Sequence, residues 1–418
     1  IFRDDGEPAF RAIERQVLRD ALATERSAIS TGGGAVVGEE VWGDDWLGDR
    51  GTMTVLLDAP AAELHARLVA QQAADPTGAT RPMLEGDDPL GRIGALKTER
   101  EPWYRRAQVT IPVQGRTPTE IGAIIARLGD PTVPTELSLD VPGGRSDVRV
   151  GSGVVAELST LVHRWPRARR VWIVADEQVA AHHLESTLAA VAASGLEVRT
   201  LTFPSGEASK SIPGLSAILD GLLDGGIERS DVVVALGGGV AGDLVGFAAA
   251  VVLRGVGLVQ IPTTLLAMVD SSVGGKTGIN HATGKNLIGA FYQPQLVLAD
   301  PTLLETLPER EYRSGWAEII KHGLIEPSTP AGDSGLFSLI AANAPALRDR
   351  TSPLLPAIIS RNVAIKASVV QADEREAGLR AILNFGHTIG HAVEAAGYQM
   401  LHGEAISVGL HGAMRLGA

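Results

Sequence analysis

Histidines and carboxylates gather in the C-terminal part of the chain at spacings that suit a metal ion. His387-Thr-Ile-Gly-His391 puts two imidazoles at positions i and i+4, on one face of a helix. His402 follows this pair in the sequence. Glu318 precedes the pair, and Lys321 lies about one helical turn after Glu318. Three nitrogen or oxygen ligands beside an open position are typical of catalytic zinc, which polarises a substrate hydroxyl or carbonyl.

The histidine spacing alone leaves more than one interpretation open. An HxxxH pair also occurs on solvated helix faces, and this pair lacks the glutamate of H-E-x-x-H, which disfavours a zinc protease. Glycines flank His387 and His402, which indicates crowded backbone at a site. Periodicity does not tell which imidazoles bind metal and which move protons. We expect the remaining nearby histidines to be structural or exposed: His281, His322 and His411.

Cationic and amide side chains lie in three glycine-rich segments that we expect to be loops. Backbone next to glycine can close around a phosphate or a carboxylate, and lysine or arginine neutralises the charge. A small anionic substrate is therefore compatible with an acidic chain. The polar residues of these segments are Arg254, Asp270, Lys276, Lys285 and Asn286.

A glycine motif between an expected strand and an expected helix suits a pyrophosphate. Gly237-Gly-Gly-Val-Ala-Gly242 satisfies G-x-G-x-x-G between the strand Asp231 to Leu236 and the helix Leu244 to Val252. A helix N-terminus offers free N–H groups to an anion. The acid that a Rossmann unit carries about 20 residues further on is absent here. The motif is therefore a nucleotide loop of a different α/β family or a plain tight turn.

Alternating strands and helices must position these groups. The elements expected from apolar patterning are strands at Val171–Ala175, Val198–Phe203, Leu258–Ile261 and Leu296–Leu298 and a helix at Gln178–Ala193. This alternation predicts a parallel sheet with covered faces. After about Leu304 the strand signals stop, which predicts an all-α region.

An earlier block reaches to about Leu128 and has its own α/β pattern. Its expected elements are helices at Pro8–Leu22, Ala61–Gln72 and Pro118–Leu128 and strands at Met53–Leu57 and Ala107–Ile111. Thr117 suits the N-cap of the last helix, because Pro118 favours the first helical position. The chain opens without methionine and stops within a helix-like stretch, so we expect a fragment.

The amino-acid composition limits the classes of protein to which this chain can belong. The 418 residues suggest two or three domains, and 44% hydrophobic residues argue against disorder. A net charge of −12 argues against nucleic-acid or anionic-membrane partners. The lack of cysteine removes disulfides, iron–sulfur clusters and thiolate chemistry. No apolar run reaches about 20 residues and no signal peptide is evident, so we expect a cytoplasmic protein.

From about Leu137 onward the sequence resembles 3-dehydroquinate synthase. The matching stretches, in the order of that family, are Pro204–Lys210, Gly237–Asp243, Gln260–Asp270, Gly274–Lys276, Gly284–Gly289, Ala317–Glu318, Leu383–His391 and Leu401–Glu404. The resemblance implies a Rossmann-like NAD-binding α/β domain at 137–304 and a helical metal- and substrate-binding domain at 305–418, preceded by a linker at 129–136. It also implies a homodimer, with Arg254 reaching across the interface.

The resemblance also implies residue roles. It makes Glu318, His387 and His402 the ligands of zinc or cobalt. It places in the substrate and catalytic set Arg254, Asp270, Lys276, Asn286, Lys321, Lys366, Arg380, Asn384 and His391. It places around NAD the residues Asp176, Glu207, Lys210, Gly238, Gly239, Asp243, Thr263, Thr264, Lys285 and Thr306.

The implied reaction belongs to the shikimate pathway. It converts 3-deoxy-D-arabino-heptulosonate 7-phosphate to 3-dehydroquinate and phosphate. Transient oxidation at C5 acidifies the neighbouring C–H, phosphate leaves, the carbonyl is reduced again, and ring opening precedes an intramolecular aldol closure. The cation set suits this substrate, because it carries a carboxylate and a phosphate.

Residues 1–128 resemble shikimate kinase, a P-loop-kinase-like α/β domain. The matching stretches are Gly6–Arg11, Thr31–Gly34, Arg81–Leu84 and Trp103–Arg105. The resemblance assigns shikimate to Arg11, Gly32, Gly33, Gly34 and Arg105, and it places Arg81 on the ATP lid. No G-x-x-x-x-G-K-[ST] occurs in the chain, so we do not expect productive ATP binding.

Three other interpretations stay open at this point. A metal-dependent polyol dehydrogenase of the iron-dependent alcohol dehydrogenase type shares the two-domain plan, although the cations favour an anionic substrate. A different sugar-phosphate cyclase would use the same groups, although the kinase-like block argues for aromatic biosynthesis. A non-catalytic fragment would retain both sites without turnover.

Overall fold

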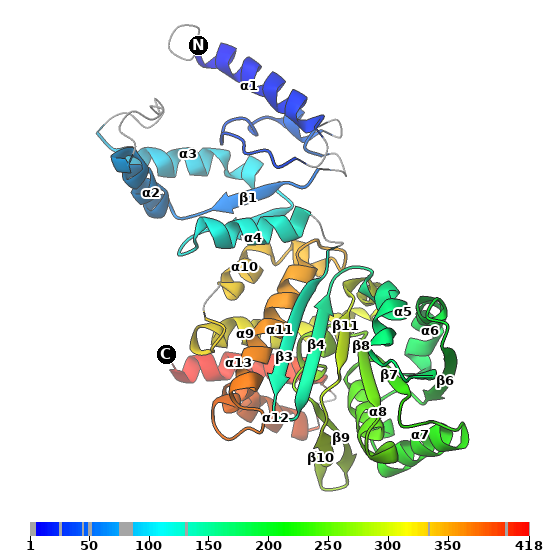
Figure 1. The fold of residues 1–418 in the computed structure, drawn as a ribbon. Coiled ribbons are helices and arrows are strands. Elements are labelled where there is room, and N and C mark those ends of the chain that lie inside the picture. Colours follow the sequence, from blue (N-terminus) through cyan, green and yellow to red (C-terminus); the bar gives the residue numbers. More distant parts are fainter. Residues whose placement is uncertain are drawn as a thin grey trace. The chain divides into compact units, whose positions relative to one another are not determined.

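The computed structural model describes residues 6–24, 27–43, 46–48, 52–74, 87–129, 133–332, 335–397 and 400–417. Contacts within the chain define two compact units (Figure 1). The first consists of residues 1–125 with 341–346, and the second of residues 126–340 with 347–418. Each unit is described by itself.

The first unit is a small α/β arrangement around a two-stranded parallel sheet. Its elements are α1 (Gly6–Leu22), β1 (Val55–Asp58), α2 (Ala61–Ala74), α3 (Pro89–Tyr104), β2 (Val109–Pro112) and α4 (Pro118–Gly129). Thr117 and Glu120 form a capping box at the start of α4, because the Glu120 carboxylate accepts the Thr117 N–H at 2.7 Å. The expected N-cap is therefore confirmed.

The second unit contains a seven-stranded sheet with the order β3-β4-β11-β8-β7-β5-β6. Its strands are β3 (Thr135–Val141), β4 (Gly144–Val150), β5 (Arg170–Asp176), β6 (Glu197–Phe203), β7 (Val232–Gly237), β8 (Gly257–Pro262) and β11 (Leu296–Ala299). All neighbours pair in parallel except β3 and β4. Every residue of β7 is buried, as expected for a central strand with covered faces.

Helices connect the parallel strands and create a switch point in the sheet. The connecting helices are α6 (Glu177–Ala192), α7 (Ile212–Asp224) and α8 (Gly239–Val251). From β5 the chain crosses to β6 on one side, and β7 then pairs with β5 on the other side. Ligands of open α/β sheets bind where the strand order reverses in this way, outside the carboxyl ends of the strands. Asp176 and Gly237 end β5 and β7 at this point.

Two antiparallel hairpins were not predicted from the sequence. One is β3–β4, and the other joins β9 (Lys276–His281) to β10 (Gly284–Phe291). The segments around Lys276 and Lys285 were expected to be loops, which is wrong. Strand packing in this hairpin requires Gly289, since a Cβ there would lie 2.0 Å from the Thr277 carbonyl oxygen. A register shift between Gly284 and Ile288 interrupts the pairing.

Helices form the rest of the second unit, as the loss of strand signals after Leu304 indicated. They are α9 (Glu309–Ile325), the first five residues of α10 (Leu336–Asn343), α11 (Leu355–Ala372), α12 (His387–Ala395) and α13 (His402–Gly417). The predicted fold class, α/β layers followed by an all-α region, is confirmed. The proposed domain division near residue 304 stays a prediction. None of the described helices combines the length and hydropathy that a bilayer crossing requires.

Close approach of α13 to α9 depends on Gly403. A Cβ at this position would lie 1.9 Å from the Ser314 carbonyl oxygen, and the Gly403 N–H donates to Ser314 Oγ at 3.1 Å. We expect Gly403→Ala to lower the free energy of unfolding by about 1–3 kcal/mol, because backbone atoms must move apart. Denaturant unfolding measures this. Gly417→Ala in the same helix is the control, since its Cβ would meet nothing within 4 Å. Equal stability of the two variants would contradict the packing argument.

Candidate metal centre

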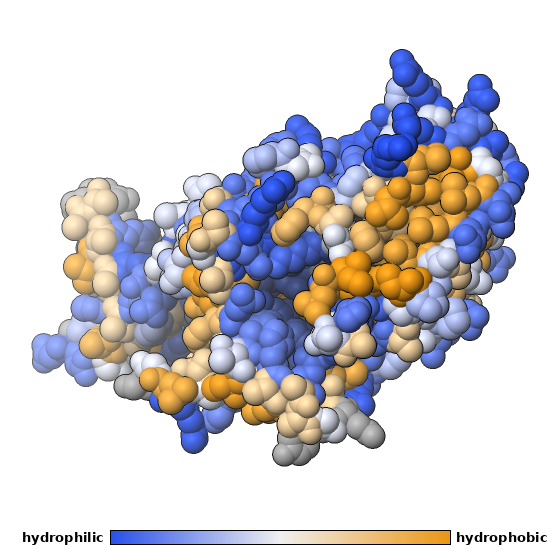
Figure 2. Space-filling model, turned by 90° about the horizontal axis from the view of Figure 1, so that it is seen from below, coloured by the Kyte–Doolittle hydropathy of each residue, from blue (hydrophilic) through white to orange (hydrophobic). Residues whose placement is uncertain are grey.

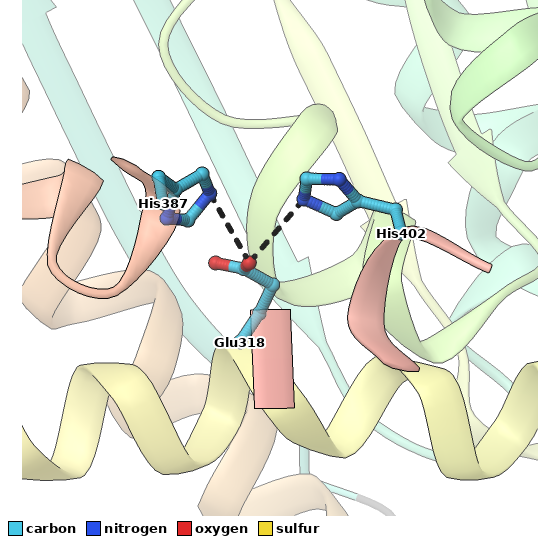
Figure 3. Close-up of side chains that lie close together, drawn as sticks. All are labelled: Glu318, His387 and His402. Atoms are coloured by element: carbon cyan, nitrogen blue, oxygen red, sulfur yellow. Dashed lines mark ion pairs between the residues drawn. The ribbon is translucent and has the colours of Figure 1, made fainter. Parts of the chain in front are cut away.

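One carboxylate and two imidazoles from three helices converge in the second unit (Figure 3). Glu318 lies in the middle of α9, whereas His387 and His402 are the first residues of α12 and α13. The Nε2 atoms of His387 and His402 lie 3.6 and 3.5 Å from the same oxygen, Glu318 Oε1. The structure therefore brings together the three residues that the family resemblance assigns to the metal.

The geometry of this group fits a divalent ion. Ligands about 2.0–2.2 Å from a tetrahedral zinc ion lie about 3.3–3.5 Å from one another. The candidate ligand atoms of Glu318, His387 and His402 all lie within 4.8 Å of one another. Glu318 Oε1 is buried and accepts no hydrogen bond. A cation would satisfy this acceptor, because buried polar atoms in folded proteins nearly always have a partner.

Glycines determine where the two histidines lie. Gly386 precedes α12 with φ +81°, a conformation that favours glycine, and a Cβ there would lie 2.9 Å from Leu410 N in α13. Gly403 packs against Ser314, one turn before Glu318 in α9. The crowded backbone that the flanking glycines indicated is therefore present. It fixes the starts of α12 and α13 close to the carboxylate.

The other histidines have different surroundings. His391 is exposed on α12, and its ring centroid lies 5.1 Å from that of His387. His322 is fully buried, and its Nδ1 lies 3.0 Å from Asn362 Oδ1. His281 and His411 are exposed. The expectation that His281, His322 and His411 are structural or exposed agrees with this burial.

Two buried lysines neutralise the carboxylates near the metal group. Lys321 Nζ donates to Glu318 Oε2, and Lys366 Nζ in α11 lies 2.8 Å from Asp270 Oδ1. Burial opposes ionisation of Glu318, but Lys321 and the neighbouring His402 and His322 together outweigh this effect and lower the pKa of Glu318 to about 2. Burial likewise opposes ionisation of Asp270, and Lys366 and Lys321 hold its pKa below the ordinary value. Both carboxylates are therefore charged at neutral pH.

Two cations of the expected anion-binding set share a carboxylate. Arg380 is buried in a short turn at Leu379–Asn384 and donates to the carbonyl oxygens of Gly274 and Glu374. Lys276 Nζ pairs with Glu376 Oε1 at 2.6 Å. Glu376 Oε1 also lies 4.0 Å from Arg380 Nε, so this carboxylate balances both cations.

Two residues of the expected set are exposed. Asn384 is exposed at the end of its turn, and Arg254 is exposed with φ +68° in the turn Val252–Arg254. Within the described part of the chain, no hydrogen bond or ion pair joins either side chain to the metal group. Their roles in substrate binding stay predictions.

The expected cofactor set clusters at the carboxyl ends of β5, β7 and β8. Asp176 caps α6 by accepting the N–H groups of Gln178 and Val179 at 3.0 Å. Gly238 and Gly239 begin α8, and a Cβ on Gly238 would lie 2.9 Å from Thr264 Cγ2. Thr263 follows β8, and its N–H donates to the Gly237 carbonyl oxygen at 3.0 Å.

The remaining members of the cofactor set have polar partners. Lys210 Nζ donates to Asp243 Oδ2 at 2.7 Å and to Asn286 Oδ1 at 2.6 Å. Glu207 accepts from Asn280 Nδ2 at 2.7 Å. Thr306 Oγ1 lies 2.7 Å from His183 Nε2. Lys285 instead pairs with Glu394 at 2.5 Å.

The start of α8 differs from the sequence expectation. The helix was expected from Leu244, but it begins at Gly239 and includes Gly242 and Asp243. Close packing favours glycine there, because a Cβ on Gly239 would lie 3.3 Å from Ser271 Oγ. The motif residues therefore present the N-terminus of a helix, rather than a long loop, at the end of β7.

Several polar residues of this site were missed by the sequence reasoning. Glu376, Glu394, Asn280 and His183 contact Lys276, Lys285, Glu207 and Thr306, which lie 73 to 123 residues away in the sequence. Two of them carried a local signal, since Glu394 falls two turns after His387 on the same helix and Glu376 lies four residues before Arg380.

The first unit shows part of the expected shikimate set. Arg11 pairs with Glu7 at 3.1 Å and packs on Gly34, where a Cβ would lie 2.3 Å from its guanidinium. The Tyr104 hydroxyl donates to the Gly33 carbonyl oxygen at 2.9 Å. A hollow of about 490 Å³ is lined by Glu7, Pro8, Arg11, Ala12, Arg15, Gly34 and Val37.

Other members of the shikimate set are placed differently or not described. Gly32 is exposed in the loop before Gly33. Arg105 pairs with Glu101 at 2.6 Å, and its side chain is 76% exposed. Arg81 lies outside the described residues. The shikimate-binding role of this unit stays a prediction.

Fold and site together define an α/β protein in which a helical region supplies a candidate centre for a divalent ion. Sequence models of three families match the chain: shikimate kinase at residues 1–128, the 3-dehydroquinate synthase N-terminal domain at 200–314 and the 3-dehydroquinate synthase C-terminal domain at 315–418. The chain is 50% identical over 283 residues to 3-dehydroquinate synthase of Roseobacter denitrificans, covering 67% of this chain and 75% of that protein. The chain belongs to the 3-dehydroquinate synthase family.

Further relatives agree with this placement. 3-dehydroquinate synthase of Caulobacter vibrioides is 49% identical over 276 residues, covering 65% of this chain and 73% of that protein. A structure of 2-deoxy-scyllo-inosose synthase with carbaglucose-6-phosphate, NAD+ and Co2+ has a TM-score of 0.58 at 28% identity, covering 66% of this chain and 73% of its own. A 2-epi-5-epi-valiolone synthase from Streptomyces hygroscopicus with NAD+ and Zn2+ has a TM-score of 0.56 at 31% identity, covering 67% and 74%.

Buried His322 makes stability depend on pH. Burial, reinforced by Lys321, lowers the pKa of His322 from 6.5 to about 4. Between these values the unfolded chain binds a proton that the folded protein does not. The free energy of unfolding of the metal-free protein should therefore fall by up to about 3 kcal/mol as pH drops from 6.5 to 4. Denaturant unfolding across this range should show a shallower fall in His322→Gln; identical pH slopes would contradict the assignment.

Proposed function

We propose that residues 137–418 carry 3-dehydroquinate synthase activity. The substrate is 3-deoxy-D-arabino-heptulosonate 7-phosphate, and the products are 3-dehydroquinate and phosphate. The observation that carries the proposal is the convergence of Glu318, His387 and His402 on one point, in a chain 50% identical to a named 3-dehydroquinate synthase. The family match supports the more general statement that the substrate is a sugar phosphate.

The chain offers residues for both cofactors that the related synthase structures contain. Glu318, His387 and His402 would hold Zn2+ or Co2+, and the helix start at Gly238 and Gly239 faces the switch point where a dinucleotide fits. When bound, the metal supplies polarisation of the substrate hydroxyl, and NAD supplies reversible oxidation of that carbon. Lys210, bonded to Asp243 and Asn286, connects the dinucleotide side to the β9–β10 hairpin.

The polar side chains around the metal group suit an anionic substrate. Lys276 and Arg380 supply positive charge for the phosphate or carboxylate, and substrate binding would replace their shared partner Glu376. Lys366 holds Asp270 ionised and in place. His391 is exposed beside the two ligand imidazoles, so its ring nitrogens can exchange a proton with substrate.

A different sugar-phosphate cyclase is the second candidate. The two related cyclase structures share the fold at 28% and 31% identity, against 50% for a named 3-dehydroquinate synthase. A shikimate kinase match in residues 1–128 favours the same pathway. A metal-dependent polyol dehydrogenase would accumulate NADH from a neutral polyol, whereas the proposed reaction regenerates NAD in each turnover.

We also propose a homodimer in which Arg254 contributes to the partner's site. Arg254 is exposed and lies in the same unit as the exposed apolar side chains of Val251, Leu287 and Phe291. Figure 2 shows a broad apolar area beside a polar hollow on one face of the molecule. Analytical ultracentrifugation of wild-type protein tests the dimer, and a monomer at micromolar concentration would contradict it.

The first unit supports a more limited proposal. Arg11 and Gly34 line a hollow in which a carboxylate such as that of shikimate could pair with the guanidinium. ATP binding is not proposed, because no G-x-x-x-x-G-K-[ST] occurs in the chain.

Release of inorganic phosphate from the heptulosonate phosphate tests the proposed reaction. The assay compares purified protein with and without added NAD and Zn2+. Phosphate and 3-dehydroquinate should form in equal amounts, without net NADH. Phosphate release without 3-dehydroquinate would favour a different cyclase.

Lys276→Ala should abolish turnover while the fold persists. The lysine lies at the start of β9 with a half-exposed side chain, so its loss removes a charge without opening the core. We expect kcat/KM to fall by about 100-fold or more. Lys97→Ala in the first unit is the control, because Lys97 pairs with Asp58, far in sequence from this site. Wild-type rates in Lys276→Ala would refute the anion site.

Chelation should stop the reaction reversibly. Removal of the ion leaves Glu318 and the two imidazoles without the charge that polarises substrate, and added Zn2+ or Co2+ should restore the rate. Metal content is measured in parallel by elemental analysis. Activity that persists after verified metal removal would rule out the metal role.

A further inference from the structure

Both nitrogens of the His402 ring face a carboxylate. Nε2 lies 3.5 Å from Glu318 Oε1, on the side of the metal group. Nδ1 lies 3.5 Å from Glu394 Oε2, on the opposite side of the ring. An imidazole that offers Nε2 to a metal keeps its proton on Nδ1, and that proton needs an acceptor. Glu394 is placed to be this acceptor.

His387 shows the same arrangement with a different acceptor. Its Nε2 faces Glu318, and its Nδ1 lies 3.3 Å from the Phe385 carbonyl oxygen. Both imidazoles of the metal group therefore have an oxygen behind them. For His387 the acceptor belongs to the backbone and cannot be removed by substitution. For His402 it is a side chain, so its contribution can be measured.

Lys285 determines how Glu394 is held. Lys285 Nζ in β10 lies 2.5 Å from Glu394 Oε1, which leaves Oε2 for His402. Glu394 is largely buried, with 18% of its side chain exposed, whereas 59% of the Lys285 side chain is exposed. The ammonium ion thus fixes the carboxylate from the solvent side and neutralises it.

The same contacts argue against a second metal ion. His391, Glu394 and His402 also lie close enough together to share an ion. However, Lys285 already supplies a positive charge to Glu394, and His402 already points its Nε2 toward Glu318. A cation at this second position would have to displace the lysine.

We propose that Glu394 is a positioning residue of the metal centre, which orients His402 by accepting its Nδ1–H while Lys285 holds the carboxylate in place. This inference rests on the metal site proposed above and adds an outer carboxylate to it. It also connects the β9–β10 hairpin to the metal through one ion pair. Carboxylates behind metal-binding histidines fix the ring orientation and raise its basicity.

Equilibrium zinc binding tests this role without any assay of activity. Chelator-stripped protein competes with a chromophoric chelator for Zn2+, which gives the dissociation constant and the stoichiometry. We expect Glu394→Ala to weaken zinc binding by about 10- to 100-fold. Glu394→Gln should recover much of the affinity, because an amide oxygen still accepts the Nδ1–H. Glu394→Asp keeps the charge, but its shorter side chain moves the carboxylate away from the His402 ring. This variant should therefore bind zinc nearly as weakly as the alanine variant.

Two further variants separate positioning from general destabilisation. Glu309→Ala removes an exposed carboxylate, paired with Arg350 at 3.0 Å, from the helix that carries Glu318. It should bind zinc as tightly as wild type. Lys285→Ala should weaken binding less than Glu394→Ala, because the acceptor remains. Thermal unfolding of the metal-free proteins should give similar midpoints for Glu394→Gln and Glu309→Ala.

Each contrary result would contradict one particular claim about Glu394 or the metal site. If Glu394→Ala binds zinc as tightly as wild type, the positioning role is wrong and the metal site stands. If wild type binds two ions per chain and Glu394→Ala binds one, Glu394 is a metal ligand instead. If wild-type protein binds no zinc, the metal site and this inference fail together. Should the alanine variant not fold, the aspartate and glutamine variants decide in its place.

Discussion

The arrangement of side chains in the second unit depends on how the negative charge of the buried Glu318 carboxylate is neutralised. Lys321 satisfies one oxygen from within the same helix, whereas the other oxygen is buried and accepts no hydrogen bond. Leaving a charged acceptor unsatisfied costs more than the roughly 1–3 kcal/mol of a neutral one. Two imidazole nitrogens stop about 3.5 Å short of that oxygen, at the separation that ligands of one ion have. A cation between them would satisfy the unpartnered oxygen.

The packing of the helices in the second unit holds the two histidines close to this carboxylate. Gly386 and Gly403 let the starts of α12 and α13 approach α9, and Lys366 reaches from α11 to Asp270. The β9–β10 hairpin carries Lys276 and Lys285 toward carboxylates of the helical region. Lys210 continues this network to Asp243 in the first turn of α8. Ion pairs and hydrogen bonds thus connect residues of the three sets that the family resemblance assigns to dinucleotide, substrate and metal.

Sequence patterns predicted the parts of this arrangement that depend on local chemistry. The apolar runs of β5, β7, β8 and β11 indicated buried parallel strands, and the glycine motif indicated a helix start after β7. The spacing of His387 and His391 placed both on one helix, but only the family resemblance selected His387 and His402 as ligands. Their convergence on Glu318 depends on helix packing between distant segments, which periodicity does not encode.

The features that sequence reasoning missed depend on contacts between residues that are far apart in the sequence. The hairpins β3–β4 and β9–β10 were not recognised, because Pro142 and two glycines interrupt the first and glycine and lysine within the second are typical of loops. Glu376 and Glu394 gave no signal as partners of Lys276 and Lys285, since about 100 residues separate each pair. The start of α8 at Gly239 was missed because helix propensity penalises glycine, whereas the tertiary site favours it.

Equilibrium binding of Co2+ to metal-free wild type and to Glu318→Gln tests the central claim most directly, because glutamine has nearly the shape of glutamate without its charge. The account predicts one ion per wild-type chain with the visible absorption of a tetrahedral or five-coordinate nitrogen–oxygen site, and a loss of that spectrum in Glu318→Gln at equal cobalt. An unchanged spectrum and affinity in Glu318→Gln would contradict it.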